Sequence, residues 1–315
     1  MDGSKNENIS VSGSTFHYFK DRLNGGKVFA NQEKSRYLRT ANASEIADEI
    51  TLTRNLYQRG FPVPEVVATG ALESGTAYYI EKSIGDRVFG DVFREETKSW
   101  GYVSDASFDE FVDVIVKYCH AQFDHRNIVA ASKNALAGIT ELENVMRNNP
   151  PSSSVAKVFA EALEKACERV MSLPWDFVQY DFNAFNVLQG GIIDFEFAGV
   201  GPIGYDVLTA VHFGRMWPKH RVAYVLTDDQ IGGYLAAIDG VAIAKGCPAV
   251  SQHGDEFLVL KAIWSTAKEK ASEANPQSNP DFWEWRVKMR DWCIRQYVNG
   301  EKIDSNRFEV AATAS

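Results

Sequence analysis

The residues of this chain best suited to chemistry are three oxygen-bearing side chains, Asp181, Asn186 and Asp194, in one short segment. Asp181 precedes Asn186 by five residues, so a loop can direct both side chains toward one point. An amide oxygen and a carboxylate suit a hard cation such as Mg²⁺, which takes few protein oxygens and completes its shell with phosphate and water oxygens. Because Asp and Asn are also common turn residues, their types alone leave a purely structural interpretation open.

A hairpin that would bring these groups together is indicated by two glycines. The Gly-Gly pair at 190–191 separates the apolar runs 187–188 and 192–195, and such a pair between strand-like runs is typical of a tight turn. Antiparallel pairing around it places Asn186 next to Asp194, since opposed residues lie about 5 Å apart at Cα. The whole string is far more restrictive than Asp-x4-Asn alone, and it predicts the catalytic and metal loops of a phosphoryl-transfer site.

Bulk composition narrows the classes of partner and compartment. The net charge is −9, which argues against nucleic acid or an anionic membrane surface as the main partner. No apolar run is long enough to span a bilayer, and the polar first ten residues do not resemble a signal peptide. The four cysteines match no zinc spacing, so we expect free thiols in a reducing compartment and a cytoplasmic protein.

The elements along the chain predict an α+β protein. Residues 9–40 read as strands, and a helix begins with Ser44 as its N-cap and ends before Gly60. After one more strand and a hinge near 81–86, the pattern becomes mostly helical. Because 315 residues exceed the usual size of one domain, we expect a small β-rich N-terminal lobe with one helix, residues 9–82. A larger, mostly helical lobe, residues 83–308, would follow and would contain the hairpin.

Taken together, these residues resemble the aminoglycoside phosphotransferase and choline kinase family, small-molecule kinases with a protein-kinase-like bilobal fold. The resemblance covers about residues 14–300, and its specific motifs lie in three places. The segment from Glu49 to Gly70 is similar to the family helix that begins with Glu and ends in Gly-x-Pro-x-Pro. Arg39, in RYLRT, occupies the position of the strand Lys or Arg. YDFNAFNVL and IIDFEFAG are similar to the His-x-Asp-x4-Asn and Asp-Phe/Trp-Glu loops.

The resemblance implies ATP and Mg²⁺ as cofactors and a role for each motif residue. Asp181 would accept or orient the proton of the attacking hydroxyl, while Asn186 and Asp194 would hold Mg²⁺ on the ATP phosphates. Arg39 would contact the phosphates and pair with Glu49. Asp206, in GYD, matches a family aspartate with a structural role.

The resemblance also implies where the nucleotide is held. The backbone of Ile80, Glu81, Lys82 and Ser83 would hold the adenine. For the glycine-rich loop we favour Gly25 and Gly26, which leave room for two strands before Arg39. Gly13-Ser14 is the other candidate, and either could be a plain hairpin turn.

Two departures from the family pattern support an alternative function. Gln179 replaces the loop histidine and Phe185 replaces the glycine before the catalytic Asn, so a pseudokinase that binds nucleotide or a partner without turnover remains the rival hypothesis. Glu196 would either assist at the metal or brace the loop.

The favoured substrate is a small molecule with a hydroxyl group. Acidic residues and tryptophans after the metal loop suit a cationic acceptor, such as an aminoglycoside or an amino alcohol. The same acidic residues could equally form solvated helix faces. They are Asp255, Glu256, Glu269, Glu273, Asp281, Glu284 and Asp291.

Overall fold

The computed structural model describes residues 7–11, 13–22, 25–126, 138–195, 197–218, 222–267 and 280–308. The chain divides into two compact units. The smaller unit consists of Met1–Asp91 and Phe185–Glu196, and the larger unit of Val92–Ala184 and Phe197–Ser315.

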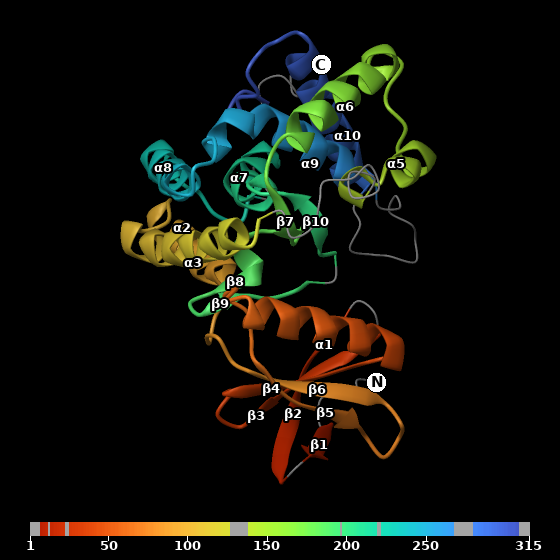
Figure 1. The fold of residues 1–315 in the computed structure, drawn as a ribbon, viewed down its shortest axis with the longest axis vertical. Helices are drawn as coiled ribbons and strands as arrows, with labels where there is room; N and C mark the ends of the chain where they lie inside the picture. The colour runs from red at the N-terminus through yellow and green to blue at the C-terminus, as the bar shows by residue number, and fades with distance from the viewer. Residues whose placement is uncertain are drawn as a thin grey trace. The chain divides into compact units, whose positions relative to one another are not determined.

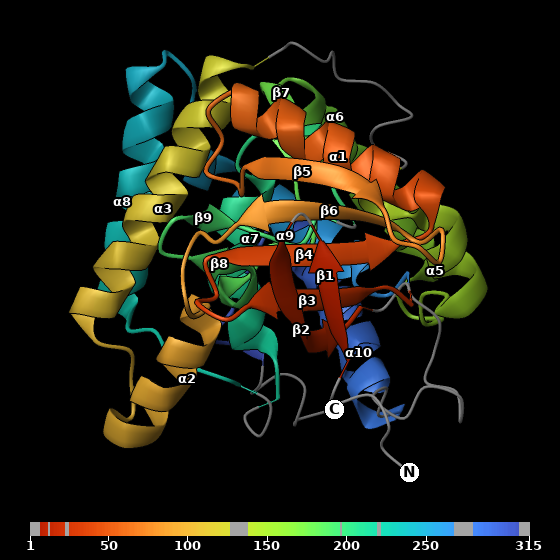
Figure 2. The same ribbon diagram turned by 90° about the horizontal axis from the view of Figure 1, so that it is seen from below.

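The smaller unit is an antiparallel sheet with one helix. Its elements are β1 (Asn8–Val11), β2 (Ser14–Asp21), β3 (Lys27–Asn31), β4 (Arg36–Ala41), α1 (Ala43–Gln58), β5 (Val66–Ala71), β6 (Ala77–Lys82), β8 (Val187–Leu188) and β9 (Gly191–Ile192). The six-stranded sheet has the order β1-β2-β3-β4-β6-β5, and β8 and β9 form a separate hairpin. The part from β3 through β4 and β6 to β5 can be followed in Figure 2.

Alternating side chains give this sheet two different apolar faces. One face carries a cluster that includes Phe16, Phe29 and Leu38. On the other, Tyr79 packs with Ile46 of α1, and α1 lies along that face in Figure 1. The N-cap of α1 is Asn42 rather than the expected Ser44, because the Asn42 side chain accepts the Glu45 amide at 2.9 Å.

The larger unit is mostly helical. Its elements are α3 (Asp105–Asp124), α5 (Leu142–Asn148), α6 (Ala156–Met171), β7 (Trp175–Val178), β10 (Gly199–Pro202), α7 (Tyr205–His212), η2 (Phe213–Met216), α8 (Asp228–Ala244), η4 (Val250–His253), α9 (Gly254–Trp264) and α10 (Pro280–Val298). Two more elements, α2 (Phe89–Trp100) and η1 (Ala184–Asn186), contain points where the chain passes from one unit to the other.

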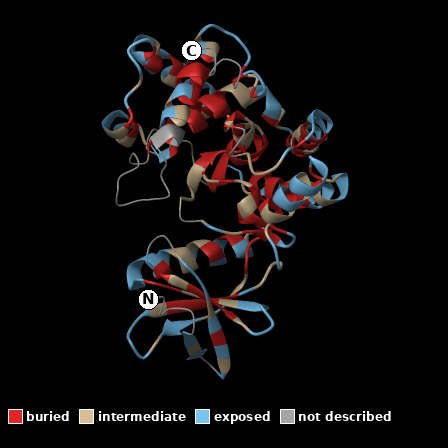
Figure 3. Ribbon diagram, turned by 180° about the vertical axis from the view of Figure 1, so that it is seen from behind, coloured by how far each residue is buried: buried red, intermediate tan, exposed pale blue. Residues whose placement is uncertain are grey.

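Helix α9 forms the centre of the larger unit. It packs against α6, α7 and α10 (Figure 1), and its residues from Glu256 to Trp264 are all buried. Figure 3 shows buried residues inside each unit and exposed residues on the outer helices and loops. None of the helices in the described part of the chain is long and apolar enough to cross a membrane. All four cysteines are free thiols, as expected.

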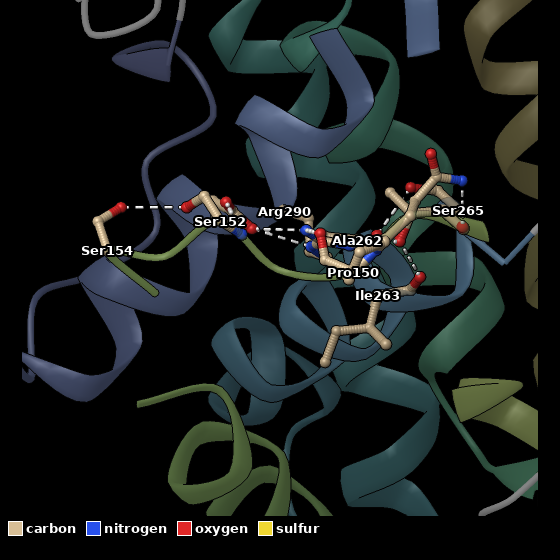
Figure 4. A network of polar contacts seen from close by, with 10 residues as sticks. Pro150, Ser152, Ser154, Ala262, Ile263, Ser265 and Arg290 are labelled. Carbon is tan, nitrogen blue, oxygen red and sulfur yellow. Dashed lines mark hydrogen bonds and ion pairs between the residues drawn. The ribbon is translucent and has the colours of Figure 1, made fainter. Parts of the chain in front are cut away.

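A buried polar network ties the last helix to this core (Figure 4). The guanidinium of Arg290 on α10 donates to the carbonyls of Asn149 and Pro150 and pairs with Asp291 at 2.8 Å. It also donates to the Thr266 hydroxyl at 3.2 Å. Because a buried guanidinium must have partners, this network fixes α10 against the segment that follows α5.

The α+β class and the division into a β-rich N-terminal part and a helical C-terminal part are confirmed. The unit boundary falls at Asp91 rather than at residue 82, and the 185–196 segment belongs to the smaller unit, not to the larger one as expected. Backbone hydrogen bonds explain the difference. Gly190 donates to the Ile84 carbonyl at 2.6 Å and Ile192 to the Pro62 carbonyl at 2.7 Å, so the hairpin is tied to the smaller unit.

Candidate active site

Asp181 follows β7, a fully buried strand, at a sharp turn in the larger unit. The Asp181 amide donates to the Gln179 carbonyl at 2.8 Å, and Tyr180 between them has φ +62°. A three-residue turn with positive φ at its centre is rare and strained. Such strain persists only when surrounding groups hold the backbone, and it gathers at functional sites.

Asp206, on α7, holds this turn from one side. Its carboxylate accepts the Gln179 amide at 2.6 Å, the Tyr180 amide at 3.0 Å and the Tyr118 hydroxyl at 2.8 Å. Burial raises the pKa of Asp206, and the Gln179 amide and the Tyr118 hydroxyl oppose that rise. The structural role expected for Asp206 is therefore visible as direct hydrogen bonds to the backbone beside Asp181.

The hairpin predicted from the Gly-Gly pair is present in the smaller unit. Val187 pairs with Ile192 and Leu188 with Gly191, and the Ile193 amide donates to the Asn186 carbonyl at 2.9 Å. Ile193, rather than the expected Asp194, therefore lies opposite Asn186, and Asp194 lies one residue beyond that position. The second strand ends at Ile192, earlier than predicted, and Asp194 itself has φ +69°.

Both glycines of the pair have a further role that the sequence did not indicate. A Cβ atom at Gly191, whose φ is +150°, would lie 2.0 Å from the Pro62 carbonyl oxygen. A Cβ atom at Gly190 would lie 2.5 Å from the Ile84 carbonyl oxygen. Glycine is therefore needed here for close backbone approach as well as for the turn.

Asn186 and Asp194 supply the donor types that Mg²⁺ prefers, one amide oxygen and one carboxylate, from neighbouring positions of one hairpin. Among the described residues, no group of three or more His, Cys, Asp or Glu side chains could hold a metal ion by itself. An ion held by Asn186 and Asp194 would take its remaining ligands from phosphate and water, which is how Mg²⁺ is usually bound. Glu196 lies outside the described residues.

The predicted ion pair between Arg39 and Glu49 is wrong. Arg39 Nε donates to Glu81 Oε1 at 2.7 Å. Glu49 instead forms a two-pronged pair with Arg22, at 3.0 and 2.9 Å, and accepts the Tyr79 hydroxyl at 2.9 Å. The register explains the exchange. Arg39 lies opposite Tyr79 on β6, so Glu81, two residues further along the same face, reaches the guanidinium.

The guanidinium of Arg39 is held in its charged form inside the smaller unit. Burial alone would lower the pKa of its guanidinium, but Glu81, Tyr79 and Glu49 together outweigh burial and raise that pKa well above its ordinary value. Among the described residues, only its Nε makes a hydrogen bond, and the side chain is 13% exposed. The two terminal nitrogens of Arg39 therefore remain available as donors.

The backbone expected to hold adenine is partly occupied within the smaller unit. The Lys82 amide donates to the Glu65 carbonyl at 3.0 Å, and the Ser83 amide donates to the Ser35 carbonyl at 2.9 Å. Ile80 and Glu81 lie in β6, between β4 and β5. The amides of residues 82 and 83 are therefore not free donors for a nucleobase.

Gly25 and Gly26 lie between β2 and β3, where two strands precede Arg39, as expected. The Arg22 amide donates to the Gly26 carbonyl at 2.8 Å, so the loop closes on itself. A hollow of about 500 Å³ beside it is lined by these glycines, the start of α1 and the loop 74–77, but by no other predicted nucleotide residue. The alternative, Gly13-Ser14, lies at the turn joining β1 to β2.

Both departures from the family pattern are accommodated inside their own units. The ring of Phe185 packs directly on Gly90, where a Cβ atom would lie 2.5 Å from it. Gln179 is fully buried, and its backbone amide donates to the Asp206 carboxylate. Sequence reasoning missed Arg22 as the partner of Glu49. Arg22 and Glu49 lie 27 residues apart, and no sequence signal connected them.

Comparisons with known proteins identify the family and the fold of this chain. The family model described as "Phosphotransferase enzyme family" matches residues 26–241. A putative aminoglycoside phosphotransferase from Ralstonia eutropha JMP134 is similar in structure, with a TM-score of 0.59 and 12% identity over 96% of this chain and 95% of that chain. No curated protein matches the chain in sequence.

Two further solved structures are similar to this chain. A thermostable mutant of aminoglycoside phosphotransferase APH(4)-Ia, in ternary complex with AMP-PNP and hygromycin B, has a TM-score of 0.55 and 16% identity, over 91% of this chain and 94% of that chain. A variant of aminoglycoside 2'-phosphotransferase-IIIa in complex with GDP has a TM-score of 0.55 and 13% identity, over 93% of each chain. At these identities the likeness shows the fold, and the kinase-like fold expected from the sequence is confirmed.

Proposed function

The chain belongs to the phosphotransferase enzyme family, and from that premise we propose that it transfers the γ-phosphate of ATP to a hydroxyl group of a small molecule. One observation carries the proposal most directly: the strained turn that presents Asp181, held through the Gln179 and Tyr180 amides by Asp206. Backbone strain of this kind gathers at functional sites, which supports a catalytic role for Asp181.

Asp181 is the group that acts on the acceptor in this proposal. Its carboxylate orients the hydroxyl of the acceptor and takes its proton as the oxygen attacks phosphorus. Phosphoryl transfer depends on positioning and charge neutralisation more than on covalent chemistry by the protein. A rigid backbone at Asp181 serves positioning, since its own carbonyl also accepts the Asn183 side chain at 2.8 Å.

Asn186 and Asp194 hold a divalent cation in the proposal. When bound, Mg²⁺ would neutralise charge on the transferred phosphate. The chain's own contribution is the fixed hairpin: backbone hydrogen bonds to Pro62 and Ile84 leave the two donors little freedom to move within the smaller unit.

Arg39 binds phosphate oxygens through its terminal nitrogens, supported by its bond to Glu81. Glu49 does not contact the nucleotide in this proposal, because its carboxylate already accepts hydrogen bonds from Arg22 and Tyr79. Through Arg22 it fixes the loop that contains Gly25 and Gly26, which we assign to phosphate contact. The adenine is held near residues 80–83 through groups other than the amides of residues 82 and 83.

The acceptor is proposed to be a cationic hydroxyl compound, on the evidence of the similar structures rather than of the acidic residues. One such structure holds hygromycin B. Three of the acidic residues expected to contact an acceptor have partners inside the larger unit. Asp255 accepts the Ile303 amide, Glu256 pairs with Arg169, and Asp291 pairs with Arg290. Glu256 and Asp291 are buried and Asp255 is half-buried, and all three are engaged within the unit. Glu284 is exposed and lies 3.5 Å from Lys288.

The proposal is tested by measuring ADP or GDP release with Mg²⁺ and a panel of acceptors. The panel contains aminoglycosides, choline, ethanolamine, homoserine and sugars. Both nucleotides are used because the similar structures hold AMP-PNP in one case and GDP in another. Turnover with at least one acceptor is expected, together with a loss of about 10²-fold to 10⁴-fold in Asp181→Ala, the usual contribution of a general base.

Asp113→Ala is the matched control, because Asp113 is an exposed carboxylate on α3 in the same unit. It should retain full turnover. Undiminished turnover in Asp181→Ala would contradict the assigned mechanism. A thermal shift with nucleotide but no turnover on any acceptor would instead favour the pseudokinase.

A further inference from the structure

Lys261 is a buried cation in the larger unit for which the proposed reaction has no role so far. It lies on α9 and is 4% exposed. Its ammonium donates a hydrogen bond to the Tyr180 carbonyl and lies 4.3 Å from the centre of the Trp264 ring. Burying a charged ammonium group costs free energy unless the group is paired, so the contacts of Lys261 indicate its role.

The carbonyl that Lys261 holds belongs to the peptide bond joining Tyr180 to Asp181. The neighbouring backbone groups are also engaged: the amides of Gln179 and Tyr180 donate to Asp206, and the Asp181 amide donates to the Gln179 carbonyl. Lys261 therefore completes the hydrogen bonding of the turn. Without it, the Tyr180 carbonyl would lose this bond inside the unit.

Two opposite charges hold the turn together. Asp206, which is 1% exposed, accepts hydrogen bonds from the amides of the turn, and Lys261 donates to the Tyr180 carbonyl. The positive N–H ends thus face a negative charge, and the negative C=O end faces a positive charge. Lys261 also lowers the pKa of Asp206, against the effect of burial, which shows that the two charges act on each other. Lys261 thus favours the ionised form of Asp206 while both side chains bond to the strained backbone.

We propose that Lys261 is a positioning residue for Asp181, a role that rests on the proposed phosphoryl transfer. By fixing the Tyr180 carbonyl it keeps Tyr180 at φ +62° and prevents the peptide bond before Asp181 from rotating. Without the ammonium, Tyr180 relaxes toward the negative φ that its side chain prefers, and the Asp181 carboxylate changes direction. Nucleotide binding is not expected to depend on Lys261.

The experiment compares Lys261→Met with Arg290→Met. Arg290 is the matched control, because it is a fully buried cation of the same unit that bonds to Asn149, Pro150, Thr266 and Asp291 but not to the turn. For each variant, kcat and the nucleotide KM are measured, together with the thermal midpoint and hydrogen exchange of the peptide covering residues 176–184. We expect kcat to fall about 10²-fold in Lys261→Met, the usual cost of misplacing a catalytic group, with KM within about twofold.

Hydrogen exchange at residues 179–181 should accelerate in Lys261→Met and stay unchanged in Arg290→Met, whose kcat per folded molecule should match the wild type. Equal losses of kcat in the two variants, or unchanged exchange at the turn in Lys261→Met, would overturn the proposal. Should Lys261→Met not fold, Lys261→Gln is read by the same measurements with the same expected direction.

The exchange measurement needs no substrate. If the wild type shows no turnover on any acceptor, the proposed function fails. Faster exchange in Lys261→Met would even then show that Lys261 holds the turn.

Discussion

The exchange of partners around Glu49 leads to a quantitative prediction for the smaller unit. The residues to change are Glu49, Arg22 and Arg39, as Glu49→Gln, Arg22→Met and Arg39→Met. The amide introduced by Glu49→Gln would keep an oxygen for the Tyr79 hydroxyl, so the substitution chiefly removes the charge. Double-mutant cycles then give the coupling free energy of Arg22 with Glu49 and of Arg39 with Glu49.

The expected size follows from geometry and burial. The Arg22 and Glu49 side chains are 11% and 19% exposed and share two hydrogen bonds of 3.0 and 2.9 Å. Exposed ion pairs contribute about 0–1 kcal/mol, and breaking a buried pair costs about 3–5 kcal/mol. A mostly buried, two-pronged pair should therefore couple by about 2 kcal/mol. Arg39 and Glu49 interact only through space, and we expect less than about 1 kcal/mol.

Urea unfolding is the appropriate assay, provided that the two units are followed separately. All seven tryptophans lie in the larger unit, at Trp100, Trp175, Trp217, Trp264, Trp283, Trp285 and Trp292. Tryptophan fluorescence therefore reports the larger unit alone, and far-ultraviolet circular dichroism reports both. The coupling should appear in the circular dichroism transition. A coupling of Arg39 with Glu49 equal to or above that of Arg22 with Glu49 would refute the assignment of partners.

Two further predictions concern stability. Gly191→Ala should destabilise the protein by about 3 kcal/mol or more, because its Cβ would lie 2.0 Å from the Pro62 carbonyl oxygen. The control Gly240→Ala, on α8, places its Cβ in open space and should be neutral or stabilising by up to about 1 kcal/mol. Urea midpoints check both, and equal midpoints for the two variants would contradict the close approach. Burial, together with Arg215, lowers the pKa of His212 from 6.5 to about 4. Between pH 6.5 and pH 4 the unfolded chain therefore binds more protons than the folded one. The free energy of unfolding should fall by about 3 kcal/mol as the pH drops through that range. His212→Gln should flatten that part of the stability curve, and an unchanged slope would exclude His212 as its source.

The features predicted best from the sequence were those that depend on residues close together in the chain. The hairpin was found because a Gly-Gly pair between apolar runs restricts the chain to few conformations. Its register was shifted by one residue from the expected one, because Val187 pairs with Ile192 and Ile193 lies opposite Asn186. The strands before α1 and strand β6 were indicated by equally local patterns, whereas β5 (Val66–Ala71) was not predicted. The N-cap of α1 was misplaced by two residues because Asn42 and Ser44 are both good caps, and only the bond to the Glu45 amide decides between them.

Long-range partners could not be predicted. The pairing of Arg39 with Glu81 depends on the register between β4 and β6, which no turn in the sequence fixes. Lys261 lies on a helix far along the chain from Tyr180, so nothing in the sequence connects them. The assignment of the hairpin to the smaller unit likewise depends on two backbone contacts, to Pro62 and Ile84.

That assignment makes the smaller unit discontinuous in sequence. A gene fragment ending at Asp91 would encode its sheet and α1 but omit the segment with Asn186 and Asp194, and the carbonyls of Pro62 and Ile84 would lose their partners. A faithful excision of this unit would need residues 185–196 grafted back through a new linker. The donors proposed for the metal therefore belong to the same unit as Arg39, although more than ninety residues assigned to the larger unit separate the two segments in the sequence.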